Sequence, residues 1–486
     1  MELNKTLSRR QFFGLAGIGL ATVALADLTG CGKADKEINC DVLVIGGGGA
    51  GTTAAAMAAD SGAKTILIEK MPWQAGSSSL ALGTLYGAGT KLQQAAGIDD
   101  TPDALLQYFL SRNGNKLDYD MQRFCADHFG ETIDWLQELG VPFKEQVSIK
   151  GKDTVPRGHN AVHNAREYLV PVTELAYKNG VEFRFNTPAE SLIVDGSGKV
   201  CGATARVNHE TLLRFNAKQT IIASGGFCRN AEMIDKYMPD YSGVYTEVGL
   251  GLTGEGLQMG LDLGAAYIGH GGTNGILACP VEPGQSKLIN GNTLWIDSAG
   301  NRFANEAGQT HDIYYTVAHF ADQKFYAIYD QAAYDALTDA LKRKMEFGLR
   351  RGMFAKADTV SDAASKLGID GATAQAALDS YNALAAAGAD TQFNKKADKL
   401  LPLTQAPYYV LQMGVCTHGS FGGYHVDTQF RVLDEQGNPI PNLYAAGEVC
   451  CGTFIYDDYP AGGCGLNFAY TSGRFSGANA AHAALA

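Results

Sequence analysis

Three glycines near the start of the chain have the spacing that suits a dinucleotide phosphate. Gly46, Gly48 and Gly51 form the pattern G-x-G-x-x-G, and the carboxylate Glu69 follows about twenty residues later. Glycine allows a tight turn and close approach of a pyrophosphate to a helix N-terminus, and the carboxylate accepts hydrogen bonds from ribose hydroxyls. The pattern predicts a dinucleotide site. Glu69 would repel a 2′-phosphate, so NADP is the least favoured cofactor, while FAD and NAD both remain open.

The elements around these residues are the ones that such a site needs. Residues 41–45, DVLVI, are β-branched and aliphatic and predict a buried strand. An alanine-rich helix follows the glycines, and a second apolar strand, TILIE at 65–69, ends in the carboxylate. Because strand, glycines, helix, strand and acid are in register, we expect an α/β protein with a Rossmann-like domain.

The composition of the chain limits the number of domains, the partners and the cofactors that we expect. The chain has 486 residues, enough for more than one domain, and its 59 glycines indicate tight turns and backbone close to a ligand. The net charge of −12 argues against a nucleic-acid partner. The ten cysteines form no CxxC or CxxCH pattern, so we predict no metal site, no attached haem and no iron–sulfur cluster. The adjacent Cys450 and Cys451 are expected to be buried thiols.

The first residues predict an export signal. Arg9 and Arg10 precede an apolar run of about fifteen residues, which is typical of a twin-arginine signal and too short for a convincing membrane span. The segment ends in LTGC at 28–31, which is similar to a lipobox with Cys31 as the lipidated residue; an ordinary exported protein is the alternative. We expect residues 1–31 to be this signal. The protein would then lie in the periplasm or cell envelope of a bacterium, touching the membrane only through a lipid on Cys31.

The segment after the second strand, EKMPWQAGSSSLALG at 69–83, resembles the loop that covers FAD in the fumarate reductase flavoprotein family. Four later segments are similar to other motifs of that family: IIASGGF (221–227), GLTGEGLQMGLDLGA (251–265), NRFANE (301–306) and NLYAAGEV (442–449). The resemblance covers residues 39–486 and implies non-covalently bound FAD. The implied cofactor contacts are Gly46, Gly48, Ala50, Gly51, Glu69, Lys70, Gly76, Ser77, Ser78, Gly83, Ala189, Ala223, Ser224, Gly225, Glu255, Gly447, Glu448, Gly465 and Leu466.

The resemblance also implies the domain organisation. A late strand would return to the first sheet, so the FAD-binding domain would be discontinuous and comprise residues 39–265 and 416–486. Residues 266–415 would form an inserted α+β capping domain that closes over the substrate. Within this cap, the aromatic run KFYAIYD at 324–330 predicts a strand, and the alanine-rich run at 362–388 predicts helix.

Members of this family reduce or form a C=C bond next to a carbonyl or carboxylate. Fumarate reductases bind a dicarboxylate through two histidines and an arginine, and protonate it with a second arginine. In this chain His270 comes about five residues too early for the first histidine. The other three positions fall on Gly419, Thr310 and Pro460. Charge-assisted hydrogen bonds are worth about 1.5–3 kcal/mol each, so their loss makes fumarate a poor substrate.

At the place of the missing arginine, DYPAGG (458–463) is similar to the Y-P-x-x-G segment of bacterial 3-ketosteroid Δ1-dehydrogenases. The resemblance implies that the Tyr459 hydroxyl and the Gly463 amide bind a substrate ketone, and two neutral donors suit an oxygen that becomes an enolate. A packed aromatic is the alternative for Tyr459. The tyrosine base of those enzymes falls at Thr310, so the candidate proton-transfer residues are His311 and His418, with Tyr314 and Tyr315 as others.

We therefore expect an exported FAD-dependent oxidoreductase of the CH–CH group. It would reduce an enone or aryl-acrylate-type acceptor by hydride transfer from FAD N5, with electrons from an external cytochrome, quinone or soluble carrier. Three alternatives remain: the same site run oxidatively as a 3-ketosteroid-type dehydrogenase, a fumarate-like dicarboxylate reductase, and a non-enzymatic flavin electron-transfer subunit.

Overall fold

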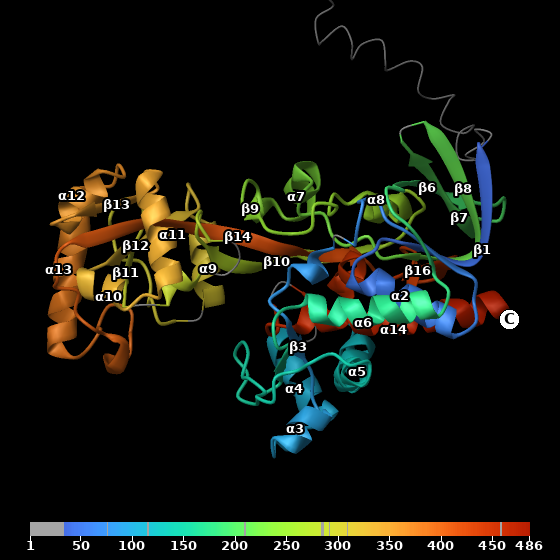
Figure 1. The fold of residues 1–486 in the computed structure, drawn as a ribbon, viewed down its shortest axis with the longest axis horizontal. Helices are drawn as coiled ribbons and strands as arrows, with labels where there is room; N and C mark the ends of the chain where they lie inside the picture. Colours follow the sequence, from blue (N-terminus) through green and yellow to red (C-terminus); the bar gives the residue numbers. More distant parts are fainter. Residues whose placement is uncertain are drawn as a thin grey trace, which may run out of the picture.

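The computed structural model describes residues 34–486, except for residues 75, 114–115, 209, 283–285, 291, 309 and 457–458 and the side chain of residue 311. The predicted export signal, residues 1–31 with Cys31, lies outside the described residues. Among the helices that the structure does describe, none is long and apolar enough to cross a membrane. The molecule is elongated, and its two main sheets follow one another along the long axis (Figure 1).

The first sheet is built around β1 (Lys36–Ile45). This strand pairs in parallel with β2 (Thr65–Ile68) and with β8 (Thr211–Ile222), which gives the order β15-β16-β8-β1-β2-β5. The other strands are β5 (Glu182–Arg184), β6 (Ala189–Val194), β7 (Val200–Val207), β15 (Arg431–Leu433) and β16 (Pro439–Ala445). Because β16 pairs in parallel with β8, the C-terminal part of the chain returns to the sheet that the N-terminal part begins.

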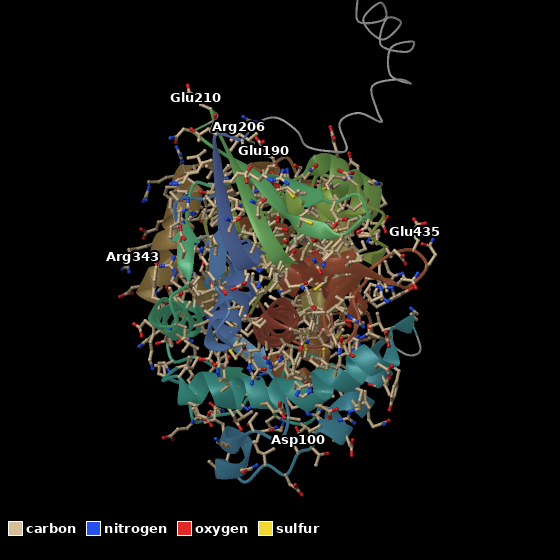
Figure 2. The ribbon with its side chains drawn as sticks, turned by 90° about the vertical axis from the view of Figure 1, so that its right-hand side faces the viewer. Asp100, Glu190, Arg206, Glu210, Arg343 and Glu435 are labelled. Atoms are coloured by element: carbon tan, nitrogen blue, oxygen red, sulfur yellow. The ribbon has the colours of Figure 1, made fainter. Side chains whose placement is uncertain are left out.

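Strands β6, β7 and β8 extend this sheet as an antiparallel ribbon. Figure 2 shows Glu190, Arg206 and Glu210 at the outer end of the ribbon and Asp100 at the opposite end of that view. Arg206 Nε lies 2.8 Å from Glu190 Oε1, and both side chains are more than one-third exposed. The pair is a surface ion pair of the kind that contributes little to stability.

Three helices cover one face of the first sheet, α2 (Gly49–Asp60), α6 (Arg166–Lys178) and α14 (Cys464–Leu485) (Figure 1). Val42 and Val44 of β1 belong to the same buried cluster as Ala54 of α2 and Ala480 of α14. Gly477 lets α14 pack closely against α2, since a Cβ on Gly477 would lie only 2.2 Å from the Ala54 carbonyl oxygen. This packing fixes the start of α14 beside the glycine turn.

Between β2 and β5 the chain forms a helical layer and a small two-stranded sheet. The elements are η1 (Ser77–Ser79), β3 (Thr84–Tyr86), α3 (Lys91–Ala95), α4 (Pro102–Asn113), α5 (Tyr119–Glu138) and β4 (Gly158–Asn160). Arg157 pairs with Asp100 at 2.7 Å and with Asp153 at 2.8 Å, and all three side chains are at most 4% exposed. This buried ion cluster anchors the segment that precedes β4.

The second sheet has the order β10-β14-β12-β11, with β9 and β13 also paired to β14. Its strands are β9 (Tyr245–Thr246), β10 (Tyr267–Ala278), β11 (Leu294–Ile296), β12 (Lys324–Tyr329), β13 (Phe354–Ala357) and β14 (Tyr408–Tyr424). The helices of this part of the chain are α7 (Ala231–Tyr237), α8 (Glu255–Leu261), α9 (Thr310–Ala318), α10 (Gln331–Asp335), α11 (Asp339–Arg350), α12 (Val360–Ser365) and α13 (Gly371–Ala387).

The long strand β14 runs from the cap at one end of the molecule to its middle (Figure 1). Its first half pairs with β12, and its second half pairs with β10. The domain boundary predicted between residues 415 and 416 therefore falls inside one continuous strand, whereas the boundary predicted at 265 lies just before β10. The cap and the FAD-binding part thus share a strand instead of a flexible linker.

Several predictions about elements hold in the structure. The α/β fold class is confirmed. The predicted strand at 324–330 is β12, and the alanine-rich run forms α12 and α13 with a turn between them. The described cysteines are free thiols, and Cys450 and Cys451 are buried as expected.

Candidate flavin and substrate site

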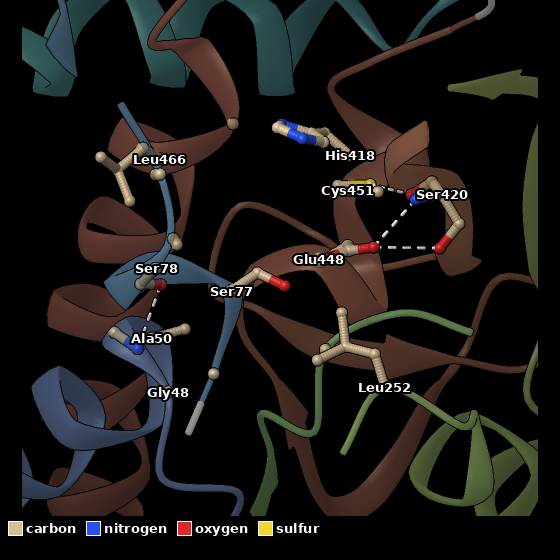
Figure 3. Close-up of a pocket in the computed structure, with 18 of the residues that line it drawn as sticks. Gly48, Ala50, Ser77, Ser78, Leu252, His418, Ser420, Glu448, Cys451 and Leu466 are labelled. Atoms are coloured by element: carbon tan, nitrogen blue, oxygen red, sulfur yellow. Dashed lines mark hydrogen bonds between the residues drawn. The ribbon is translucent and has the colours of Figure 1, made fainter. Parts of the chain in front are cut away.

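A cavity of about 550 Å³ lies where the glycine turn, the start of α14 and the second sheet meet. This volume is in the range of ligand pockets, about 300–1,000 Å³. Figure 3 shows Gly48, Ala50, Ser77 and Ser78 on one side of the cavity and Ser420, Glu448 and His418 on the other. The cavity is therefore lined by residues that are distant in the sequence.

The glycine turn between β1 and α2 forms one wall. Gly46 has a φ of +113°, which favours glycine, and Gly48 is the N-cap of α2. A Cβ on Gly76 would lie 2.7 Å from the Gly48 α-carbon, and Ser78 Oγ accepts a hydrogen bond from Gly49 N at 3.2 Å. The loop at 76–78 thus packs directly on the turn, and a side chain at position 76 would prevent this contact.

Glu69 stands at the end of β2 beside this turn. Its Oε2 accepts a hydrogen bond from Gly47 N at 2.7 Å, and its Oε1 accepts one from Met71 N at 2.8 Å. The neighbouring Lys70 pairs with Glu255 at the start of α8, with 2.8 Å between Nζ and Oε2. These groups line the cavity at the end where the sequence pattern predicts the nucleotide.

Two buried polar groups line the cavity further along. Glu448 Oε1 accepts hydrogen bonds from Ser420 N at 2.8 Å and Ser420 Oγ at 3.1 Å (Figure 3). Burial raises the pKa of the Glu448 carboxyl, and the bonds from Ser420 act in the opposite direction. Ser224 Oγ is buried and has no hydrogen-bond partner among the described residues. An unpaired buried hydroxyl on a cavity wall fits a bound polar ligand such as FAD.

The structure brings nearly all predicted FAD contacts to this one cavity. Its lining includes Gly46, Gly48, Ala50, Glu69, Lys70, Gly76, Ser77, Ser78, Gly83, Ala189, Ala223, Ser224, Gly225, Glu255, Gly447, Glu448, Gly465 and Leu466. Gly51 is the exception. A Cβ on Gly51 would lie 1.9 Å from the Gly46 carbonyl oxygen, so this glycine allows α2 to pack against the turn that follows β1.

Tyr459 and Gly463 line the cavity at the start of α14. The Tyr459 ring stacks on Phe421 with a centroid distance of 5.3 Å, and its Oη accepts a hydrogen bond from Gly465 N at 2.8 Å. Burial raises the pKa of Tyr459, so the hydroxyl keeps its proton at neutral pH. Gly463 is the N-cap of α14 with a φ of +109°, and a Cβ there would lie 3.0 Å from Thr84. The protonated phenol of Tyr459 and the N-terminus of α14 therefore both line the cavity.

His418 lies on the cavity wall with Glu247 as its partner. The distance from His418 Nε2 to Glu247 Oε2 is 3.4 Å, and both side chains are less than one-fifth exposed. Burial lowers the pKa of His418, and Glu247 partly opposes this effect. Ligand atoms of Glu247, Cys416 and His418 lie within 4.8 Å of one another, close enough for one metal ion to reach all three. However, burial raises the pKa of the Cys416 thiol to about 12, which disfavours the thiolate that a metal binds.

The positions that the resemblance aligns with three cations of the fumarate reductases also meet at the cavity. Thr310, Gly419 and Pro460 all line it. His270 does not line the cavity, and its ring instead contacts that of Tyr456 with a centroid distance of 3.4 Å. His311 is in α9, and its side chain lies outside the described part of the structure.

Sequence reasoning missed several lining residues. Glu247, Asn274 and Phe421 belong to strands β10 and β14 or follow β9, and Arg112, Lys150 and Lys152 come from α4 and the segment before β4. None of them stands in a local motif. Only Phe421 had a nearby signal, because it follows the position that carries the second substrate histidine in the fumarate reductases.

The glycine turn on a parallel sheet, with a cavity at its carboxyl edge, defines a dinucleotide-binding α/β protein. Residues 41–466 match the FAD binding domain family, and the chain belongs to that family. Vinyl phenol reductase of Lactiplantibacillus plantarum is 28% identical over 494 residues, which cover 92% of this chain and 97% of that protein.

Two solved structures are similar over most of the chain. The open conformation of a flavocytochrome c3 fumarate reductase has a TM-score of 0.80 and 28% identity, covering 93% of this chain and 80% of that one. The 3-ketosteroid-Δ4-(5α)-dehydrogenase of Rhodococcus jostii RHA1, in complex with 4-androstene-3,17-dione, has a TM-score of 0.74 and 26% identity, covering 93% and 98%. The protein is an FAD-dependent oxidoreductase that acts on CH–CH bonds, so the predicted cofactor and enzyme class are confirmed.

Proposed function

We propose that the protein reduces a C=C bond conjugated to a ketone or aryl carbonyl. The observation that carries this proposal is that Tyr459 and Gly463, whose hydroxyl and amide are neutral donor groups, both line the cavity. Pro460, at the position that the resemblance assigns to a carboxylate-binding arginine, lines it as well. Neutral donors stabilise a carbonyl oxygen that gains charge, whereas a dicarboxylate needs cationic partners. The similarity to a 3-ketosteroid dehydrogenase, solved in complex with the enone 4-androstene-3,17-dione, supports a substrate of this kind.

FAD would be held without a covalent bond by the cavity wall that carries Gly46, Gly48 and Glu69, which we call the nucleotide wall. Gly46, Gly48 and the N-terminus of α2 would face the pyrophosphate, and Glu69 would accept hydrogen bonds from a ribose. Ser224 and Glu448 would contact the more buried part of the cofactor. When bound and reduced, FAD supplies a hydride to the substrate double bond.

Tyr459 polarises the substrate in this scheme. Its hydroxyl donates to the substrate carbonyl oxygen, while Gly465 N donates to Tyr459 Oη at 2.8 Å and so orients the phenol. The N-terminus of α14, with its partial positive charge, stabilises the oxygen as negative charge develops on it. The Gly463 amide is the second donor on the same wall.

His418 transfers the proton. The imidazolium donates a proton to the substrate carbon next to the carbonyl, and Glu247, 3.4 Å away, stabilises the charged ring. Because burial lowers the pKa of His418, only part of the protein carries this proton at neutral pH. In the reverse direction the neutral imidazole accepts a proton. The lowered pKa of His418 therefore favours a 3-ketosteroid-type dehydrogenation as the second candidate function.

The proposal extends to the electron donor and to the location. An external cytochrome, quinone or soluble carrier would reduce the flavin. The twin arginines at Arg9 and Arg10 and the LTGC segment support an extracytoplasmic location, with Cys31 as a lipid anchor.

Product analysis tests the proposal. FAD-loaded protein receives electrons from reduced methyl viologen without oxygen, and benzalacetone and cinnamates serve as acceptors. We expect the saturated compound to form with two viologen radicals consumed for each product molecule. Failure to reduce every enone and arylacrylate in such a panel would contradict the proposal.

A further inference from the structure

Three cationic residues that line the cavity come from the helical layer, and none of them is at a position that the resemblance aligns with a cation of the fumarate reductases. Arg112 at the end of α4 and Lys150 and Lys152 in the segment before β4 line the cavity. Their positive charge makes them candidates for binding an anion.

The carboxylates of the cavity already have partners within the protein. Glu255 pairs with Lys70, Glu247 pairs with His418, and Glu448 accepts hydrogen bonds from Ser420. Lys152 is paired as well, since its Nζ lies 3.1 Å from Asp312 of α9. Lys150 is different, because no ion-pair partner for it occurs among the described residues.

The surroundings of Lys150 make its charge costly. The side chain is partly buried, and its stem packs against Gly158, where a Cβ would lie 2.6 Å from Lys150 Cγ. Burial lowers the pKa of Lys150, and the nearby Lys144 lowers it further. A partly buried cation with a like charge nearby is stabilised when an anion binds to it.

Lys150 lies close to the loop that carries Tyr459 and Gly463. A Cβ on Gly462 would lie 4.0 Å from Lys150 Cδ, and a Cβ on Gly151 would lie 2.9 Å from the Pro460 carbonyl oxygen. Tyr108 Oη donates to that same oxygen at 2.6 Å. The segment around Lys150 therefore lies against the loop that carries Tyr459 and Gly463.

We propose that Lys150 forms an anion subsite that binds a carboxylate of the substrate remote from the reacting double bond. The preferred acceptor is then an enone or aryl carbonyl compound that carries an acidic group at its far end. Tyr459 and Gly463 bind the carbonyl oxygen, and Lys150 binds the carboxylate. This inference rests on the proposed function and adds a substrate class to it.

Matched substrates and matched variants test the subsite. The probes are 4-(4-carboxyphenyl)but-3-en-2-one and its methyl ester, which differ only in the remote charge. Lys150→Met keeps the packed stem and removes the charge, while Lys150→Arg keeps the charge. Lys144→Met is the control, since Lys144 is exposed, close to Lys150 and not part of the cavity lining. Flavin content and thermal melting are measured for each variant.

We expect Lys150→Met to raise the KM of the carboxylate probe about 10- to 100-fold, the value of one charge-assisted hydrogen bond. The KM of the ester should change by less than about twofold, kcat should stay the same, and Lys150→Arg should restore most of the affinity. The inference is overturned if Lys150→Met affects both probes equally, or if Lys144→Met has the same effect. If the wild-type protein reduces neither probe, the proposed function itself fails.

Discussion

Replacement of Tyr459 by phenylalanine removes one hydroxyl group and leaves the ring that stacks on Phe421. In the structure Tyr459 Oη accepts from Gly465 N, so the phenolic proton is directed to another acceptor, which we infer is the substrate carbonyl. Loss of one preorganised donor to a developing oxyanion lowers kcat about 100- to 1,000-fold. Gly463 N and the N-terminus of α14 remain in this variant, so we expect kcat to fall by this factor and not to zero.

The same substitution has a small structural cost. Gly465 N loses its acceptor, which reduces the free energy of unfolding by about 1 kcal/mol. No FAD contact of the nucleotide wall changes, so flavin content should equal that of the wild type. The assay is viologen-coupled reduction of benzalacetone with flavin content measured on the same sample.

Tyr108→Phe is the matched control. Tyr108 Oη supports the same loop through the Pro460 carbonyl oxygen, but Tyr108 does not line the cavity. We expect this variant to retain kcat within about threefold, since hydrogen bonds outside the reacting centre contribute little to transition-state binding. If Tyr459→Phe keeps full kcat, or if both variants lose activity equally, the hydroxyl of Tyr459 is not the carbonyl donor.

Two further predictions concern His418 and Gly51. Because burial lowers the pKa of His418 below its usual value of about 6.5 and reduction uses the imidazolium, the reduction rate should rise about tenfold for each unit of pH decrease above that pKa. A rate profile of the wild type and of His418→Gln checks this, and the same slope in both would exclude His418 as the donor. Gly51→Val places side-chain atoms against the Gly46 carbonyl oxygen, where a Cβ would already lie at 1.9 Å, so the purified variant should contain little or no flavin. Gly196→Ala, which has open space around its Cβ, is the control, and full flavin content in Gly51→Val would contradict the role of Gly51 in packing α2.

The nucleotide wall could be predicted from the sequence because its information is local. Gly46, Gly48 and Glu69 belong to one strand–turn–helix–strand unit, and the physical needs of the turn are visible in the residue types. Gly51 shows the limit of such reasoning. It belongs to the motif, but in the structure it packs α2 against the turn after β1 and does not line the cavity.

The substrate end was harder to predict because its residues come from separate segments. Tyr459 and Gly463 stand in a recognisable motif, whereas Glu247 and Lys150 reach the cavity only through strand pairing and packing. The predicted domain boundary at 415 lies inside β14. The strand continues through 17 residues although it contains Gly419, Gly422 and Gly423, and its pairing partner changes from β12 to β10 at Gly414.

The central claim is that the cavity favours a ketone-type acceptor over a dicarboxylate. Stopped-flow reoxidation of the dithionite-reduced, FAD-loaded protein by benzalacetone and by fumarate at equal concentrations tests it most directly. Because the resemblance aligns Thr310, Gly419 and Pro460 with the cations that bind a dicarboxylate in fumarate reductases, we predict reoxidation by the enone at least about 100-fold faster than by fumarate. Reoxidation by fumarate at an equal or higher rate would contradict the account.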